Sequence, residues 1–160
     1  MHLSSHGIAV DLPPGWGGTI ARRPRAGEAG AAAAGARPEE QVLPVAHLST
    51  FPLPADRGDF GSGAVDVMGG GDVFVALVEY GPECAGTALF RSPRLPRPSV
   101  GDFSPRRLQR AIAGQAGFQG WCTVAGRAFC TYVVLGSVTR AADLVPATHA
   151  LLASTRIEPR

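Results

Sequence analysis

Residues 72–80, Asp72-Val-Phe-Val-Ala-Leu-Val-Glu-Tyr80, decide the fold class of this chain. The run is apolar at odd and even positions alike and contains no glycine or proline. A strand with one solvent-facing side alternates apolar and polar residues, whereas a strand covered on both faces is apolar throughout. We therefore expect residues 72–80 to form a central strand, with another strand on each side.

Two segments further along the sequence predict a β-hairpin. Residues 117–124 and 128–136 are rich in β-branched and aromatic residues, and Ala125-Gly126-Arg127 joins them. If the loop holds these three residues, Cys122 faces Cys130 across the hairpin. We expect the two thiols to stay reduced in the cell and to be close enough for an oxidant to bridge them.

Further strands are predicted before residue 72 and near residue 160. Residues 7–12 and 19–23 flank the turn Pro13-Pro14-Gly15, which predicts an opening hairpin. Residues 42–51 form another β-type run, and residues 153–158 are expected to close the sheet as its last strand.

Three helices are expected between these strands, at residues 82–90, 104–114 and 143–152. The second has the clearest signals, with Ser104 at the N-cap, Pro105 at the first helical position and Gly114 just past the end. The last helix would begin at Asp143, which leaves Pro146 in the first turn, where its missing N–H costs nothing.

This order of elements predicts an α+β fold, with a mainly antiparallel sheet flanked by helices. The chain has 160 residues, of which 45% are hydrophobic and 18% charged, so a single domain spanning residues 1–160 is expected. Residues 24–41 consist largely of Ala, Gly, Pro, Arg and Glu without periodicity, which predicts a flexible loop insertion.

Both ends of the chain resemble the PsbP/Mog1-like superfamily. Gly7-Ile-Ala-Val-Asp-Leu-Pro-Pro-Gly-Trp16 resembles the start of these domains, and the helix leading into Leu151-Leu-Ala-Ser-Thr-Arg-Ile157 is similar to their closing helix and strand. The resemblance implies an α/β/α sandwich around an antiparallel sheet. It also implies a non-catalytic role, because most members are accessory subunits, lipoproteins, adaptor chaperones or a binder of a small GTPase. The insertion at residues 24–41 and the arginine-rich proline loop depart from that pattern.

Charge and targeting signals narrow the possible partners. All fifteen basic residues are arginine, and the net charge of +2 is too small to indicate nucleic acid as a partner. The N-terminus has no basic segment followed by an apolar one, and no apolar run reaches the roughly 18 residues that span a bilayer. We therefore expect a cytoplasmic protein with no membrane partner.

The sequence marks no catalytic residue, no cofactor site and no metal site. Gly61-Ser62-Gly63 lacks the strand-to-helix context of a nucleophile elbow, and Gly69-Gly70-Gly71-Asp72 precedes a strand, whereas phosphate-binding loops follow one. His47 and His149 stand alone in a predicted strand and a predicted helix. The three cysteines form no paired metal signature.

One cluster of basic residues could form a binding site. Six arginines fall within twenty positions, opposed only by Asp102: Arg91, Arg94, Arg97, Arg106, Arg107 and Arg110. In the predicted helix, Arg106 and Arg107 would lie in the first turn, where the helix dipole repels positive charge unless an anion is near. Such a region could receive a carboxylate, a phosphate or an acidic protein surface. The alternative is a solvated face.

The leading hypothesis is a non-catalytic protein-binding or adaptor domain whose partner is another protein. That partner would bind to the sheet face or to the Arg91–Arg110 side. One alternative is a small-molecule or anion-binding enzyme with a site assembled from dispersed residues, which needs a concave cleft with convergent polar groups. The other is a structural subunit of a larger assembly.

Overall fold

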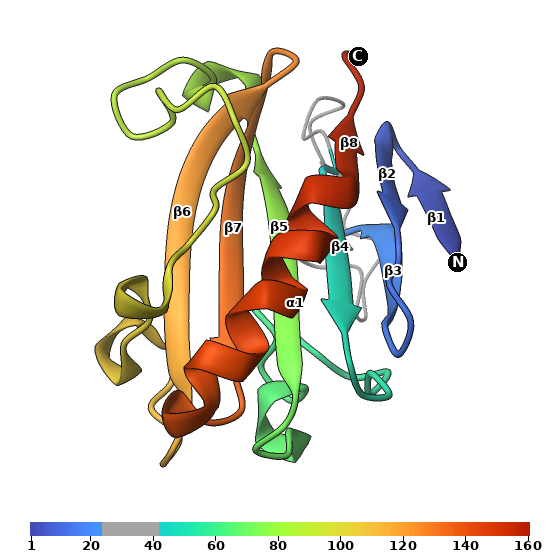
Figure 1. The fold of residues 1–160 in the computed structure, drawn as a ribbon. Coiled ribbons are helices and arrows are strands. Elements are labelled where there is room, and N and C mark those ends of the chain that lie inside the picture. The colour runs from blue at the N-terminus through green and yellow to red at the C-terminus, as the bar shows by residue number, and fades with distance from the viewer. Residues whose placement is uncertain (24–41) are drawn as a thin grey trace, which may run out of the picture.

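A computed structural model describes residues 1–23 and 42–160, which form two antiparallel sheets and one α-helix (Figure 1). The smaller sheet has the order β1 (His2–Ser5), β2 (Ile8–Asp11), β8 (Thr155–Ile157). The larger sheet has the order β3 (Gly17–Arg22), β4 (Pro44–Ser49), β5 (Val73–Tyr80), β7 (Arg127–Leu135), β6 (Ala116–Val124). Helix α1 spans Ala141–Ser154, and the 3-10 turns are η1 (Val65–Val67), η2 (Pro82–Cys84), η3 (Val100–Asp102), η4 (Pro105–Arg107) and η5 (Val138–Arg140).

Strand β5 is the central strand, as its sequence predicts. It lies between β4 and β7, and only Tyr80 among its residues is not fully buried. Val73, Val75 and Leu77 pack into one core with α1, while Phe74, Ala76 and Val78 pack into a second core on the other face. The α+β class with antiparallel strands is therefore confirmed.

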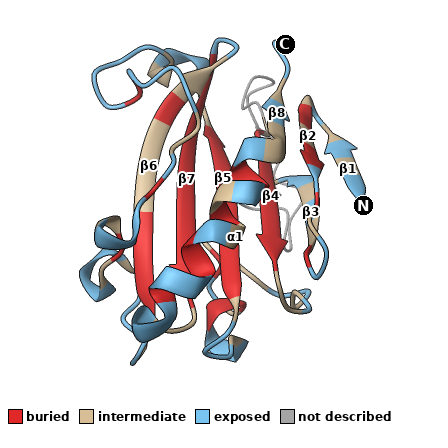
Figure 2. Cartoon of the chain, in the orientation of Figure 1, coloured by how far each residue is buried: buried red, intermediate tan, exposed pale blue. Residues whose placement is uncertain are grey.

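The two faces of the large sheet are covered differently. Helix α1 and strand β2 cover one face, and both the helix side and the sheet side of this interface are buried (Figure 2). Non-helical segments cover the other face through Phe51, Phe60, Leu108 and Ile112. The expectation of three helices is wrong for the part of the chain that the structure describes, where α1 is the single α-helix.

The expected opening hairpin is wrong, although both of its strands form. Strand β2 pairs with β1, whose turn at His6 and Gly7 has φ of 53° and 72°, and with β8. Strand β3 instead pairs with β4 in the large sheet. The prolines at 13 and 14 do not make a tight hairpin turn here; they carry the chain from one sheet to the other, with Trp16 buried at the crossing. Strand β8 pairs with β2, so it closes the small sheet and not the large one as expected.

The expected helix at residues 104–114 is also wrong beyond its first turn. The Ser104 hydroxyl does accept a bond from the Arg106 N–H, but helical geometry ends at Leu108, which is extended at φ −73° and ψ 140°. Ser104 pairs with Gly117 of β6, and a Cβ on Gly117 would lie 2.9 Å from the Arg107 carbonyl oxygen. Tertiary pairing with the sheet therefore overrides local helix propensity.

The β6–β7 hairpin forms with a loop one residue shorter than expected. Ala125 and Gly126, at φ of 52° and 73°, make a two-residue turn of the kind favoured in hairpins. The shorter loop places Cys122 opposite Phe129 and Cys130 opposite Trp121. The prediction that the cysteines face each other is thus wrong, and each thiol lies in a different core.

The remaining boundaries differ by a few residues. Helix α1 begins at Ala141, directly after η5, so Asp143 lies inside its first turn and Pro146 in its second. The helix expected at residues 82–90 is limited to η2, with Pro82 at its first position as predicted. The predicted loop at residues 24–41 lies outside the described residues.

Candidate functional site

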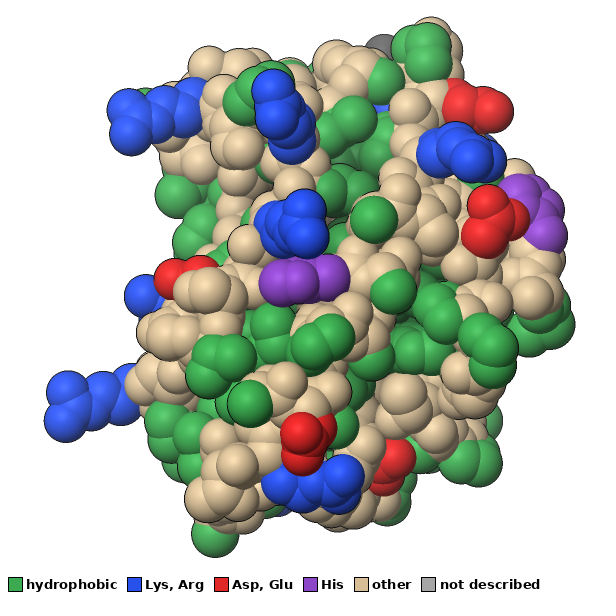
Figure 3. Space-filling model, viewed as in Figure 1, with side chains coloured by type: hydrophobic (Ala, Val, Ile, Leu, Met, Phe, Trp, Pro, Cys, Tyr) green, Lys and Arg blue, Asp and Glu red, His purple; other side chains and the backbone are tan. Residues whose placement is uncertain are grey.

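The structure places the predicted cluster beside β6 in two groups, one near Thr123 and one near Gly117. We call the two groups together the arginine surface: Arg91, Arg94, Arg97, Arg106, Arg107 and Arg110. All six side chains are exposed. The first three lie on the segment that follows Phe90, and the next two belong to η4. On the β6 side of the view in Figure 3, basic side chains protrude, and most of them have no acidic side chain beside them. On the opposite side, basic and acidic side chains lie next to each other.

Five of the six arginines make no ion pair with any described residue. Arg110 is the exception, because its Nη2 lies 2.6 Å from the Asp66 carboxylate. Asp102 is held instead by Ser99, whose backbone N–H and hydroxyl lower the pKa of this carboxyl, and the positive charge of Arg107 lowers it further. The arginine surface therefore carries positive charge that the described chain does not neutralise.

The segment that bears Arg91, Arg94 and Arg97 is fixed to the sheet and the helix. The Thr123 N–H donates to the Ser92 carbonyl at 2.8 Å. The Thr123 hydroxyl donates to the Phe90 carbonyl at 2.8 Å, and the His149 ring of α1 is hydrogen-bonded to the Pro98 carbonyl. These arginines thus extend from an anchored backbone.

Two surface hollows border this region. One, of about 480 Å³, lies between η4 and β6 and is lined by Arg106, Arg107, Leu108, Gln109, Gln119 and Trp121. The other, of about 300 Å³, lies between residues 95–97 and α1 and includes His149. The first hollow is therefore lined by two arginines without an ion pair, by the Trp121 indole and by the edge strand β6.

The argument from a helix dipole does not hold for Arg106 and Arg107. Turn η4 has three residues, so it carries no aligned series of peptide dipoles of the kind that produces a helix macrodipole. What remains of the electrostatic case is the unpaired charge itself.

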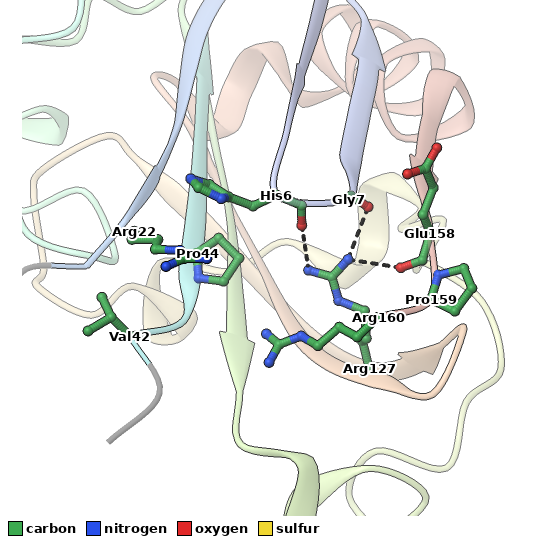
Figure 4. A pocket seen from close by; sticks show the side chains of 9 residues that line it. All are labelled: His6, Gly7, Arg22, Val42, Pro44, Arg127, Glu158, Pro159 and Arg160. Carbon is green, nitrogen blue, oxygen red and sulfur yellow. Dashed lines mark hydrogen bonds between the residues drawn. The ribbon is translucent and has the colours of Figure 1, made fainter. Parts of the chain in front are cut away.

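A different arginine, Arg127, has the most complete set of contacts in the described chain. Its Nε and Nη2 donate to the two Glu79 carboxylate oxygens at 3.0 and 2.8 Å. Its Nη1 donates to the carbonyls of Gly7 and Glu158 at 3.0 and 2.9 Å, and Nη2 also donates to the His6 carbonyl at 3.0 Å (Figure 4). All five guanidinium N–H groups are therefore used.

Arg127 joins three parts of the fold and does not present a free binding group. It is 4% exposed and stacks over the Phe129 ring at 5.3 Å, at the base of a hollow of about 430 Å³. Arg160 also lies at this hollow, 2.8 Å from Glu79. This junction was not predicted from the sequence, although one signal points to it: Arg127 is the only charged residue in the apolar run 127–135.

The remaining candidate groups have structural roles. His47 accepts a bond from Arg57 Nε at 2.9 Å and donates to the Asp59 carbonyl at 2.8 Å, and burial lowers its pKa. Burial raises the pKa of the Cys122 and Cys130 thiols to about 11 and about 12, which keeps them protonated. Within residues 1–23 and 42–160, no three His, Cys, Asp or Glu side chains converge to hold a metal ion.

The glycine-containing turns considered in the sequence are also structural. The Asp72 carboxylate accepts the Gly69 N–H at 2.7 Å and the Thr50 hydroxyl at 3.1 Å, which fixes the turn before β5. Ser62 is exposed, and its carbonyl accepts from the Gly58 N–H within a local turn. Neither turn provides a phosphate cradle at the start of a helix.

No protein-family model matches this chain, and no curated protein or solved structure matches it either. Among the described helices, none is long and apolar enough to cross a membrane. The described residues form an α+β fold with exposed arginines beside the edge strand β6.

Proposed function

We propose that this chain is a non-catalytic protein-binding module of the cytoplasm, and that it captures an acidic segment of another protein at the arginine surface. The observation that carries the proposal is the group of five exposed arginines without an ion pair among the described residues. They lie on segments that hydrogen bonds fix to β6 and α1. An anchored group of like charges attracts a partner of the opposite charge.

Guanidinium groups suit carboxylates, because each can donate two parallel hydrogen bonds to one carboxylate. Arginine also stacks on flat groups, and Trp121 lines the same hollow as Arg106 and Arg107. An acidic segment would satisfy donors that now face only solvent. Such contacts set specificity and association rate more than raw affinity, and salt weakens them.

Two buried ionisable groups away from the arginine surface favour binding over catalysis. Arg127 has no free donor, and His47 uses both ring nitrogens in the fold. A general base or nucleophile needs a group that can exchange a proton with substrate. The resemblance to PsbP/Mog1-like domains supports the same class, since most members of that superfamily are accessory or adaptor proteins.

The proposal is tested by anisotropy of a labelled peptide in which glutamate and glycine alternate. We expect the parent chain to bind it in low salt and to release it as salt rises. Replacing Arg97, Arg106 and Arg107 together by glutamine should weaken binding by about tenfold or more, since each lost ionic hydrogen bond contributes roughly 1.5–3 kcal/mol before screening.

The matched control replaces three other exposed arginines, Arg22, Arg140 and Arg156, by glutamine and lowers net charge equally. Equal weakening in both variants would overturn the proposal, because binding would then follow net charge alone. Tighter binding of a single-stranded oligonucleotide of equal charge would also overturn it and would indicate a nucleic-acid partner. Size exclusion of the parent chain addresses the structural-subunit alternative.

A further inference from the structure

Within residues 1–23 and 42–160, the outer edge of β6 is hydrogen-bonded at two points only. Strand β6 ends the five-stranded sheet, so none of the described strands pairs with its outer side. Ser104 exchanges both backbone hydrogen bonds with Gly117 at 3.0 Å. Near the other end, the Thr123 N–H donates to the Ser92 carbonyl at 2.8 Å. These two contacts cap the edge at its ends.

Between these points the edge is open. Backbone groups along a strand point alternately to its two neighbours, so Gln119 and Trp121 point outward as Gly117 and Thr123 do. Their outward N–H and C=O groups have no hydrogen-bond partner among the described residues. The middle of β6 is only half-buried, in contrast to the fully buried β7 beside it (Figure 2).

The intervening chain, residues 93–103, does not close this window, because it passes over the face of the sheet that α1 covers. A Cβ on Gly120 would lie 3.1 Å from Pro96, which places this segment above the sheet face. Leu95 and Phe103 pack into the core that contains α1. The window from Gly117 to Thr123 is about 20 Å long, at about 3.4 Å per residue.

The two sides of the open edge differ in chemistry. Gln119 and Trp121 line the hollow that also holds Arg106 and Arg107. On the other side, Gly120 meets Pro96 and Phe118. A strand added here would place alternate side chains on these two sides, one basic and one apolar.

Building on the proposed function, we infer that the partner segment binds as an extended strand, antiparallel to β6. Residues opposite Gln119 and Trp121 exchange backbone hydrogen bonds with them and direct acidic side chains towards Arg106 and Arg107. The residue between them is apolar and covers Gly120 and Pro96. A second copy of this chain does not suit the window, because its own arginine surface would meet that of the first copy.

The test uses an acetylated, amidated heptapeptide in which glutamate and valine alternate, beginning and ending with glutamate. In the inferred register, the glutamate N–H groups point to β6 and the valine N–H groups point away. Methylating the backbone nitrogens of the third and fifth residues, the two central glutamates, should therefore weaken binding by about tenfold or more, since two hydrogen bonds are lost. The isomer methylated on two of the valines has the same charge and size and should bind like the parent peptide.

Hydrogen exchange on the full chain tests the same contact by measuring the backbone amides of β6. Adding the parent peptide should slow exchange at the Gln119 and Trp121 amides. It should leave the Cys122 amide, which points to β7, unchanged. Gln119→Pro removes one outward N–H at an edge position where proline is tolerated, and Gln119→Ala is its control.

The outcomes separate this inference from the proposed function. If both methylated isomers bind equally well and the Arg97/Arg106/Arg107 variant binds neither, the arginine surface binds acidic chains and the added strand is wrong. If no acidic peptide binds the parent chain in low salt, both are wrong. Strand addition is supported only when methylation of the glutamates, and not of the valines, weakens both binding and the protection of the Gln119 and Trp121 amides.

Discussion

Arg127 and Arg107 are the same residue type in opposite situations. Arg127 is 4% exposed, donates through every guanidinium N–H, and joins Glu79 to three carbonyls from both ends of the chain. Arg107 is exposed and makes no ion pair within the described residues. The charge of the first is neutralised by the fold, whereas the charge of the second is directed to solvent.

This difference shows which arginines the fold needs. In a chain whose basic residues are all arginine, composition cannot separate structural from binding residues. Burial and donor satisfaction separate them, because a buried charge costs stability unless it is paired and hydrogen-bonded, while an exposed one does not. The comparison predicts large stability effects at Arg127 and small ones on the arginine surface.

The largest effect is expected for Arg127→Met. The substitution removes the bidentate partner of the buried Glu79 carboxylate, which keeps only its ion pair with Arg160 among the described residues. It also removes the donors of three carbonyls. We expect unfolding free energy to fall by about 3–5 kcal/mol, measured by urea denaturation followed by circular dichroism.

Two further variants show whether the loss comes from the unpaired charge. Arg127→Met combined with Glu79→Gln should recover part of the loss, because the buried side chain that has lost its bidentate partner is then neutral. Arg140→Met, at an exposed arginine 4.0 Å from Asp143, should stay within about 0.5 kcal/mol of the parent. If Arg127→Met were as mild as Arg140→Met, burial would not be the property that separates these arginines.

The sequence predicted where the strands lie better than it predicted which strands pair with each other. The apolar pattern of residues 72–80 predicted the central strand β5, because a strand that is buried on both faces is apolar at odd and even positions alike. The pairing of β2 with β1 and β8 had no comparable mark, since residues 2–5 are polar at three of four positions and β8 has three residues. Strand pairing is decided by contacts between segments distant in sequence, here sequence positions 8 and 157.

The predictions of a helix at residues 104–114 and of a cysteine pair were wrong for two different reasons. Ser104 and Pro105 are good signals for a first turn, and they gave one turn, but pairing with Gly117 and burial of Leu108 required an extended chain afterwards. The cysteine register depended on a single loop residue. The arginine surface could be predicted because a charge cluster is visible in sequence, whereas the Arg127 junction is formed by long-range contacts.

A pH effect sharpens the comparison through Arg57, an arginine between the two extremes. It is half-buried and donates to His47, Thr19 and the Pro54 carbonyl. Burial is the main cause of the lowered pKa of His47, so the native state favours the neutral ring. Below about pH 6.5 the unfolded ring takes up a proton before the native ring does, so stability falls as pH drops.

We expect the unfolding free energy, measured by urea denaturation, to decrease between pH 7.5 and 5.5 by at most about 1.4 kcal/mol per pH unit for one proton. His47→Gln keeps an acceptor for Arg57 and a donor for the Asp59 carbonyl, so it should flatten this slope. The lowered pKa values of Asp11 and Asp102 act at lower pH, outside this range. An unchanged slope in His47→Gln would assign the effect to another group.

The smallest effect is expected for Arg106→Gln combined with Arg107→Gln. Both side chains are exposed, so their removal should change unfolding free energy by no more than about 0.5 kcal/mol, and relief of repulsion between neighbouring charges gives a slight gain in low salt. Thermal and urea unfolding in low and high salt measure this difference, which should disappear as salt screens the repulsion. Arg106→Lys with Arg107→Lys keeps the charges and should match the parent. A loss above about 1 kcal/mol in the glutamine variant would mean that these arginine stems support the packing of η4 against β6, and the contrast with Arg127 would then be one of degree.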